Sequence, residues 1–205
     1  ESQLLQPNGS VVDITGAGKL ERDQQGTSNL FNYNFWSSPV NDNGSTYSLS
    51  NVLKDASNPA NPMSVNWTSS DNADGTTSPV TLSRRWLYTY TNAPQGSYYD
   101  WFQISELSQL SGGQGYLMKG SGTSGLDFNY TFKGIPNNGD YIVNLSPNNQ
   151  GLVGNPYPSA LDGYSFITDN QSSLESGTLE IWEHAPSNNT HVTRDYQGGY
   201  AVLSL

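Results

Sequence analysis

The sequence predicts an all-β fold, a β-sandwich or jelly roll of antiparallel strands, and three observations lead to this prediction. Short stretches of β-branched and aromatic residues recur along the chain, clusters of Asn, Asp, Gly and Pro separate them, and helical periodicity is always short. Charged residues make up only 13% of the chain, so solubility must come from Ser, Thr, Asn, Gln and Gly, which suit turns and strand faces but form poor helices.

The expected strands are short, and several alternate between apolar and polar residues. The clearest is 128–132, where Phe128, Tyr130 and Phe132 share one face and Asn129 and Thr131 the other, as in a strand with one buried side. Further strands are expected at 11–14, 30–36, 85–90, 115–119, 140–145, 151–154, 178–184 and 199–205.

Helical turns are expected only at 49–56, 104–110 and 159–167, the last capped by Ser159 or Asp162. The segment 51–79 contains three prolines among Ser, Asn and Asp residues, and we expect a long polar loop anchored by Val65 and Trp67. A single domain over 1–205 is expected, although residues 1–28 could belong to the end of a strand-rich region upstream.

Composition excludes several classes of function. Eighteen acidic residues against eight basic ones give a net charge of -10, which repels phosphate backbones, so we expect no nucleic-acid partner. The absence of cysteine removes disulfides, Cys-ligated zinc, iron–sulfur clusters and thiol catalysis. No apolar run approaches the roughly 18 to 20 residues that span a bilayer, so no membrane insertion is expected.

We expect no enzymatic activity, because no catalytic grouping stands out. A Ser-His-Asp triad needs a base, and only His184 and His191 are present, without a Gly-x-Ser-x-Gly elbow. Glycoside hydrolysis needs two carboxylates across a cleft. Glu180 with Glu183, or Asp169 with Glu180, could be proposed, but eighteen acidic residues make chance pairs abundant.

Calcium is the best inorganic candidate, although no cofactor is required. Asp71 and Asp74 lie in the loop 71–75, and Asp42 lies in the loop 41–44; such Asx-rich loops present hard oxygen ligands. Neither loop matches an EF-hand, and both are also typical of Asx turns. The sequence thus leaves Ca²⁺ binding and simple turns as alternatives.

Aromatic content of 12%, with five Trp and thirteen Tyr, raises the question of carbohydrate binding, because sugar C–H faces stack on exposed rings. The candidate glycan-binding residues are Trp67, Tyr98, Tyr99, Trp101 and Tyr196. Tyr98, Tyr99 and Trp101 cannot all face inward from one strand, so at least one of these rings should be exposed.

A structural corner is expected at Asn155, Pro156, Tyr157 and Pro158. Each proline pushes the residue before it out of the helical region, and the Tyr157–Pro158 bond is a candidate for the cis isomer. We expect this corner to aim the following helical turn back over the core.

Six segments resemble a module of large secreted and cell-surface proteins of flavobacteria and related Bacteroidetes. They are 20–22, 31–40 with the motif WSSPV, 115–120 (GYLMKG), 132–140 (FKGIPNNGD), 154–162 (GNPYPSALD) and 196–201. The resemblance covers about residues 18–205. It implies type IX secretion cargo in an extracellular or outer-surface location, and it implies no reaction. Full-length members have a long upstream region and a C-terminal sorting domain, so we expect a fragment or a processed form.

The leading hypothesis is a non-catalytic structural or adhesive module of a bacterial surface protein or filament, whose partners are other copies or domains of the parent protein. The alternative is a carbohydrate-binding module with glycan partners, calcium-dependent or not, in a secreted polysaccharide-degrading protein. If the chain polymerises, residues 11–14 or 201–205 could be donated as a strand to a neighbour's sheet edge.

Overall fold

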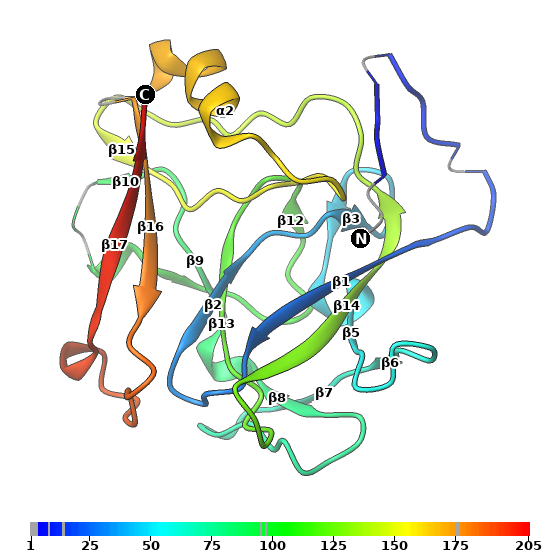
Figure 1. Cartoon of the computed structure of the whole chain (residues 1–205), viewed down its shortest axis with the longest axis vertical. Helices are drawn as coiled ribbons and strands as arrows, with labels where there is room; N and C mark the ends of the chain where they lie inside the picture. The colour runs from blue at the N-terminus through cyan, green and yellow to red at the C-terminus, as the bar shows by residue number, and fades with distance from the viewer. Residues whose placement is uncertain (1–3, 8, 14, 95, 97, 175–176) are drawn as a thin grey trace. The chain divides into compact units, whose positions relative to one another are not determined.

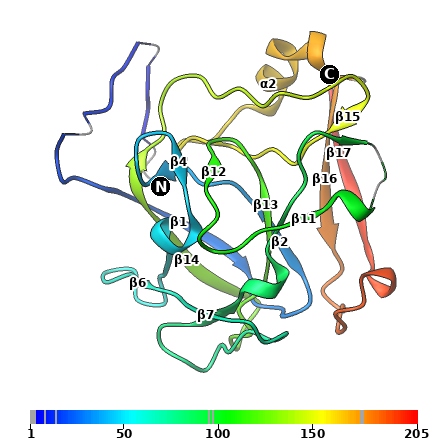
Figure 2. The ribbon, with the colours of Figure 1, turned by 180° about the vertical axis from the view of Figure 1, so that it is seen from behind.

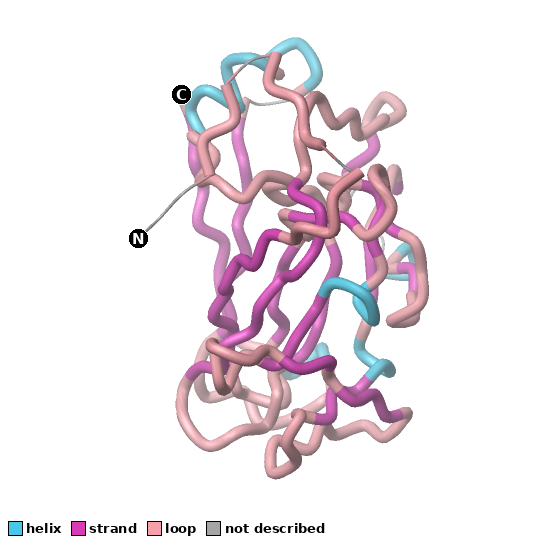
Figure 3. The backbone as a smooth tube through the Cα atoms, turned by 90° about the vertical axis from the view of Figure 1, so that its right-hand side faces the viewer, coloured by secondary structure: helices cyan, strands magenta, loops and turns pink. Residues whose placement is uncertain are grey.

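The computed structural model describes residues 4–7, 9–13, 15–94, 96, 98–174 and 177–205 (Figure 1). It confirms the all-β prediction: antiparallel sheets dominate, and the regular structure is mostly strand (Figure 3). The chain forms two compact units, Glu1–Ser159 and Ala160–Leu205. Within the described residues, no helix has the length and apolar character needed to cross a membrane.

The first unit contains a five-stranded sheet built around its longest strand. Its strands are β14 (Asp127–Pro136), β1 (Leu20–Thr27), β5 (Leu53–Asp55), β6 (Met63–Ser64) and β3 (Val40–Asn41), in the order β1–β14–β5–β6 with β3 paired to the end of β14. All these pairs are antiparallel. The strand predicted at 128–132 is therefore the centre of this sheet.

A four-stranded antiparallel sheet forms the other main layer of the first unit. Its strands are β11 (Phe102–Gln103), β9 (Tyr88–Thr89), β13 (Tyr116–Lys119) and β2 (Tyr33–Trp36), in that order. Short pairs complete the unit: β4 (Thr46–Tyr47) with β12 (Leu110–Ser111), β10 (Ala93–Pro94) with β15 (Asn149–Gln150), and β7 (Asn66–Thr68) with β8 (Thr81–Ser83). Figure 2 shows β4 and β12 side by side.

The core lies between the two main sheets, which pack in a sandwich-like manner. Trp36 on β2 meets Tyr130 and Phe132 on β14 in edge-to-face geometry, with ring centroids 5.2 and 5.9 Å apart. As predicted, Phe128, Tyr130 and Phe132 are buried on one face of β14. Thr131 on the other face is buried too, and its hydroxyl is satisfied by donating to the Asp23 carboxylate of β1.

Several expected elements are corrected. Residues 11–13 and 140–145 are not strands, Ile14 is outside the described residues, and 151–154 contributes only a single bridge from Val153 to Gln114. Residues 104–109 form a loop with one turn instead of a helix, and Leu110 begins β12. Residues 49–56 form a one-turn helix, α1 (Leu49–Val52), that runs into β5. These runs have apolar residues but lack a pairing partner or the length that a helix needs.

The segment 51–79 is not one long loop, since it includes the end of α1 and the strands β5, β6 and β7. Leu53 is fully buried in the core, and the buried Asp55 carboxylate accepts hydrogen bonds from the backbone N–H groups of Val80 (2.7 Å) and Ser57 (2.8 Å). Val65 and Trp67 do anchor the segment to the core, as expected. This segment therefore makes more contacts with the core than its polar composition predicted.

The second unit consists of a short helix and a two-stranded antiparallel ribbon. Helix α2 (Gly163–Asp169) begins after Asp162, whose carboxylate accepts a 2.8 Å bond from the backbone N–H of Ser165, which confirms one of the two predicted caps. The strands β16 (Thr178–His184) and β17 (Gly198–Ser204) pair along their whole length and lie close to the predicted bounds. Three-residue 3-10 turns, η3 (Gln171–Ser173) and η4 (Thr193–Asp195), lie in the connections.

The corner at 155–158 is built by side-chain hydrogen bonds. The Asn155 side chain accepts from the backbone N–H of Tyr157 (2.9 Å) and donates to the Ser159 carbonyl (2.6 Å). The cis bond expected at Tyr157–Pro158 is absent; among the described residues the cis bond is Ser78–Pro79. The Asx turn made by Asn155 already fixes the direction of the chain, so the corner forms with a trans bond.

Asn137, a fully buried side chain, ties this corner to the five-stranded sheet. Its amide donates to the carbonyls of Ser38 (2.9 Å) and Pro156 (2.8 Å), and its carbonyl accepts from the Asn41 side chain (2.9 Å). One side chain therefore satisfies three buried polar groups from distant parts of the sequence.

We expect Asn137→Ala to lower the free energy of unfolding by about 2–4 kcal/mol, because buried carbonyls lose their donor without gaining water. Urea unfolding followed by tryptophan fluorescence measures this change. The neighbouring Asn138→Ala is the control, since Asn138 is only partly buried and bonds to Ser10 near the N-terminus. Equal destabilisation by the two variants would contradict the role given to Asn137.

Candidate functional site

An open hollow of about 530 Å³ lies beside the 3-10 turn η1 (Arg84–Trp86) of the first unit. We call it the Arg85 pocket. Its lining residues are Ser69, Arg84, Arg85, Gln103, Ile104, Ser105 and Ser108. Sequence reasoning did not identify this pocket, although the predicted residues Trp67 and Asp71 belong to the segment that forms one of its walls.

A pair of parallel strands brings the two walls of the pocket together. β7 and β8 are paired in parallel, with Trp67 opposite Leu82 and Thr68 opposite Ser83, in contrast to the antiparallel pairing expected throughout. Because parallel strands end at the same edge, the loop after β7 and the turn η1 after β8 emerge side by side. Trp67 and the buried Leu82 fix this pair to the core.

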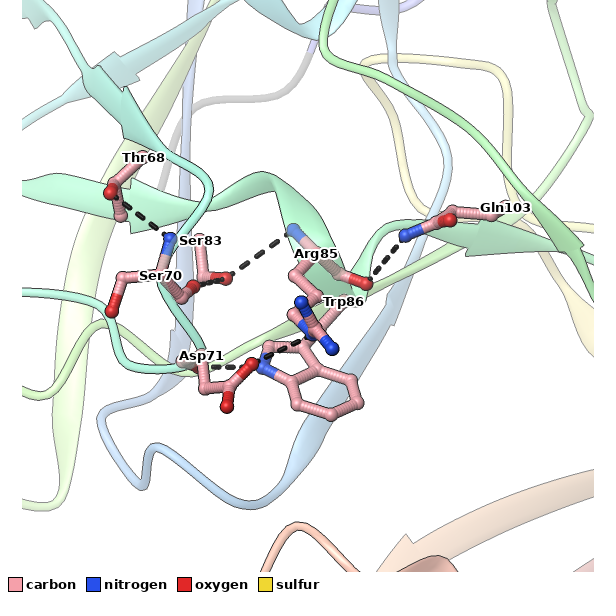
Figure 4. Close-up of polar contacts among 7 residues, drawn as sticks. All are labelled: Thr68, Ser70, Asp71, Ser83, Arg85, Trp86 and Gln103. Carbon is pink, nitrogen blue, oxygen red and sulfur yellow. Dashed lines mark hydrogen bonds and ion pairs between the residues drawn. The ribbon is translucent and has the colours of Figure 1, made fainter.

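Hydroxyl groups lock the loop after β7 to the start of η1 (Figure 4). The Ser83 hydroxyl donates to the Ser70 carbonyl (2.6 Å) and accepts from the backbone N–H of Arg85 (3.3 Å). The backbone N–H of Ser70 in turn donates to the Thr68 hydroxyl (3.2 Å). The backbone around Arg85 is therefore held from two sides before its side chain is considered.

Asp71 orients the side chains of Arg85 and Trp86 (Figure 4). Its carboxylate lies 2.7 Å from Nε of Arg85, and its backbone carbonyl accepts a 2.6 Å bond from the indole N–H of Trp86. The side-chain amide of Gln103 on β11 donates to the Arg85 carbonyl (2.9 Å). Arg85 is thus fixed at its backbone and at the inner end of its guanidinium.

Arg84 is held by a second, more deeply placed ion pair. Its guanidinium lies 3.0 Å from Oε1 of Glu106, a carboxylate that is buried. The side chains of Arg84 and Arg85 remain 43% and 57% exposed. Since a guanidinium has five N–H donors and each ion pair involves one nitrogen, both residues present further donors at the pocket wall.

Lys119, at the end of β13, is buried against the ring of Trp86. It is 4% exposed, and its Nζ lies 3.8 Å from the ring centroid of Trp86 and 5.0 Å from that of Tyr33. Burial lowers the pKa of Lys119 to about 7, while the Asp71 carboxylate acts in the opposite direction. Trp86 therefore contacts a cation and is hydrogen-bonded to the loop that bears Asp71.

The predicted metal ligands are not brought together. Asp71 is paired with Arg85, and Asp42 accepts hydrogen bonds from the backbone N–H (3.1 Å) and hydroxyl (3.2 Å) of Ser48. Asp74 accepts from the backbone N–H (2.9 Å) and hydroxyl (2.6 Å) of Thr76, bonds that lower the pKa of its carboxyl. Within the described residues, no cluster of three His, Cys, Asp or Glu side chains could hold a metal ion.

The predicted glycan-binding rings of the first unit have different environments. Trp67 packs against the core. Tyr99, in the 3-10 turn η2 (Tyr98–Asp100), is 95% exposed, whereas the partly buried Trp101 packs on Tyr90 with ring centroids 5.1 Å apart. The side chain of Tyr98 lies outside the described part of the chain. The expectation that at least one ring of this cluster is exposed is confirmed by Tyr99.

The remaining candidate, Tyr196, belongs to a ring cluster on one face of the β16–β17 ribbon. His184 meets Tyr196 and Trp182 with centroid distances of 5.3 and 5.7 Å, and Trp182 meets Tyr200 at 4.8 Å. The indole N–H of Trp182 donates to Nδ1 of His184 (3.2 Å). Tyr200, which sequence reasoning did not select, is 64% exposed and is the most accessible ring of the cluster.

Residues 1–203 match a family that is described as a domain of unknown function, DUF8693. The chain belongs to this family. No curated protein and no solved structure matches it. The match to DUF8693 spans both compact units.

The lowered pKa of Lys119 leads to a prediction about stability and pH. In the unfolded chain a lysine titrates near pH 10.4, about three units above its pKa in the folded protein. Between these two values the folded protein binds fewer protons at this site than the unfolded chain does, so the wild-type free energy of unfolding should rise with pH relative to Lys119→Met.

Urea unfolding of wild type and Lys119→Met at several values between about pH 6 and pH 9 measures this difference. From about pH 7 upward, the free energy of unfolding of the wild type should rise relative to that of Lys119→Met. Below about pH 7 the difference between the two proteins should stay constant. Lys133→Met, which removes a more exposed lysine of β14, is the control for loss of a positive charge. The same pH dependence in both variants would contradict the proposed environment of Lys119.

Proposed function

We propose that this protein is a non-catalytic structural or adhesive module, placed on the outer cell surface or outside a bacterial cell as part of a surface protein or filament. The resemblance to type IX secretion cargo of flavobacteria and related Bacteroidetes supports the location. The use of carboxylates supports the non-catalytic role: Asp42, Asp74 and Asp162 all accept backbone N–H groups in turns or at a helix start.

The observation that carries this proposal is the open edge of β17. One edge of β17 pairs with β16, and the other has no strand partner among the described residues. Natural edge strands are protected by charged residues, proline or a covering element. β17 has neither a charged residue nor a proline, and Tyr200 and Val202 are exposed on it. An edge of this kind is suited to pairing with a strand of a neighbouring copy or domain.

Carbohydrate binding is the second candidate, and the exposed rings Tyr99 and Tyr200 favour it. Tyr200 lies beside Trp182 on the ribbon, so a sugar could stack on one ring while contacting the next. If carbohydrate binding depends on calcium, the Ca²⁺ ion has to displace hydrogen bonds that the Asp42 and Asp74 carboxylates already accept.

Adding a positive charge to the open edge should prevent pairing, since Lys is the residue with which natural edge strands avoid association. We expect wild-type protein to associate in a concentration-dependent manner and Val202→Lys to associate at least about tenfold more weakly. Light scattering coupled to size exclusion, together with electron microscopy of native material, measures this. Val192→Lys, at another exposed valine of the second unit, is the matched control.

A wild type that stays monomeric at every concentration, and forms no assembly on the cell surface, would rule out the structural proposal. Deleting residues 1–16 separates the two strand-donation versions. Loss of assembly in this deletion but not in Val202→Lys would show that the N-terminal segment supplies the strand, and would reject the role given to β17.

A further inference from the structure

We propose that the open edge of β17 binds a basic strand of a partner domain, in which lysine or arginine alternates with apolar residues. This inference rests on the pairing of β17 given under the proposed function, and it adds the chemistry of the strand that pairs best. Copies of this chain can associate through the same edge, but a basic strand should bind more tightly than a second copy does.

The second unit, to which β17 belongs, is strongly acidic. Its sequence has no lysine, and its one arginine, Arg194, lies 3.5 Å from the Asp195 carboxylate. β17 itself has no charged residue. A strand with positive charge is therefore attracted to this unit, whereas an acidic strand is repelled. The acidic residues among those that the structure describes here are Asp162, Asp169, Glu180, Glu183 and Asp195.

Glu183 is placed to meet a basic side chain at this edge. It is exposed on β16 and lies opposite Gly199 of β17 in the antiparallel register. Residues directly opposite each other share one face of a sheet. Gly199 has no side chain, and a Cβ at this position would have no heavy atom within 4 Å. The face of the ribbon is therefore open over Gly199, between Glu183 and the edge.

A lysine or arginine beside Gly199 on an added strand can reach Glu183 across this gap. The added strand lies two strand spacings from β16, which is about 9.6 Å. The long stem of Lys or Arg spans most of this distance, and the Glu183 side chain covers the rest. The next glycine offers no such path, because a Cβ at Gly198 would lie 2.5 Å from the Trp182 ring. An Asp or Glu beside Gly199 would instead bring a like charge toward Glu183.

The other face of β17 favours apolar residues in the partner strand. Tyr200 and Val202 are 64% and 59% exposed on this face, and Tyr200 meets the Trp182 ring edge-to-face at 4.8 Å. Aromatic and β-branched side chains on neighbouring strands stabilise each other. Successive residues of a strand point to opposite faces, so a strand with apolar residues beside Tyr200 and Val202 places its other residues beside Gly199 and Ala201. The two faces together predict the alternation.

The segments of a second copy that could be donated match this pattern less well. β17 carries no positive charge, so pairing of two β17 strands gains no ion pair with Glu183. The segment 11–13 contains Asp13, which would bring a negative charge to an edge that is already acidic. Both segments can supply backbone hydrogen bonds, and both lack the charge that Glu183 favours.

The test is fluorescence anisotropy of labelled, end-blocked peptides with the full chain at about 0.15 M salt. In three peptides of about seven residues, valine alternates with lysine, with serine or with glutamate. Because these peptides repeat every two residues, each register that puts valine beside Tyr200 also puts the variable residue beside Gly199. We expect the lysine peptide to bind at least about fivefold more tightly than the serine peptide, and the glutamate peptide to bind most weakly. The lysine peptide should also dissociate assemblies of the wild type in light scattering.

Reversal of one charge separates the local contact from general attraction. Glu183→Lys should weaken binding of the lysine peptide at least about tenfold and strengthen binding of the glutamate peptide by a similar factor. Asp169→Lys makes the same change of charge in α2, whose Gly163 packs beside Leu203 at the other end of β17, and should alter either affinity less than about twofold (Figure 1). Thermal unfolding of each variant verifies that it is folded.

Failure of the lysine peptide to bind would overturn the inference, as would equally tight binding of the serine peptide or equal effects of Glu183→Lys and Asp169→Lys. Val202→Lys should abolish binding of the serine peptide too, because this change blocks the edge itself. Unchanged binding of the serine peptide by Val202→Lys would place the contact elsewhere and also overturn the inference.

The outcomes for the edge and for the basic partner remain separate. If the wild type associates, Val202→Lys does not, and the peptides show no preference for lysine, the proposed function stands and the basic partner is rejected. If the wild type stays monomeric but binds the lysine peptide in a manner that depends on Glu183, the basic partner is confirmed and assembly of identical copies is rejected.

Discussion

The contact of Trp36 with Tyr130 and Phe132 is the interaction on which the first unit depends. It joins the two main sheets, because Trp36 lies on β2, an edge strand of the four-stranded sheet, and its two partners lie on β14, the strand that pairs with β1, β3 and β5. The fit is close enough to restrict a neighbouring residue: a Cβ at Gly26 of β1 would lie 2.6 Å from the indole of Trp36. Only glycine lets β1 pass this ring.

The same core positions the Arg85 pocket through a short series of contacts. Tyr130 lies opposite Asp55 in the β14–β5 register, and the Asp55 carboxylate accepts the backbone N–H of Val80. Val80 directly precedes β8, which leads into η1 and Arg85. A buried carboxylate therefore fixes the start of the strand that leads to the pocket wall, and Arg84 and Arg85 stand on a turn that the core holds in place.

Alternation in the sequence was sufficient to predict β14, where Phe128, Tyr130 and Phe132 share one buried face. It was insufficient for β1, whose sequence LERDQQGT is polar on both sides and becomes a strand through backbone pairing with β14. The pocket was missed for a related reason: the parallel pairing of β7 and β8 is a tertiary event without a local signal. Lys119 in the otherwise apolar run 115–118 was the available clue, since a cation there must be buried or end the strand.

Lys119 is a buried lysine in an otherwise apolar strand. Taking an ammonium group out of water is unfavourable, and the contacts of Lys119 with the rings of Trp86 and Tyr33 stabilise its charged form. A hydrophobic residue of similar size would satisfy the packing of a scaffold at this position without the penalty. The lowered pKa of Lys119, about 7, removes part of this penalty, because the side chain loses its proton near neutral pH, and the stability of the first unit therefore responds to the protonation of this one group.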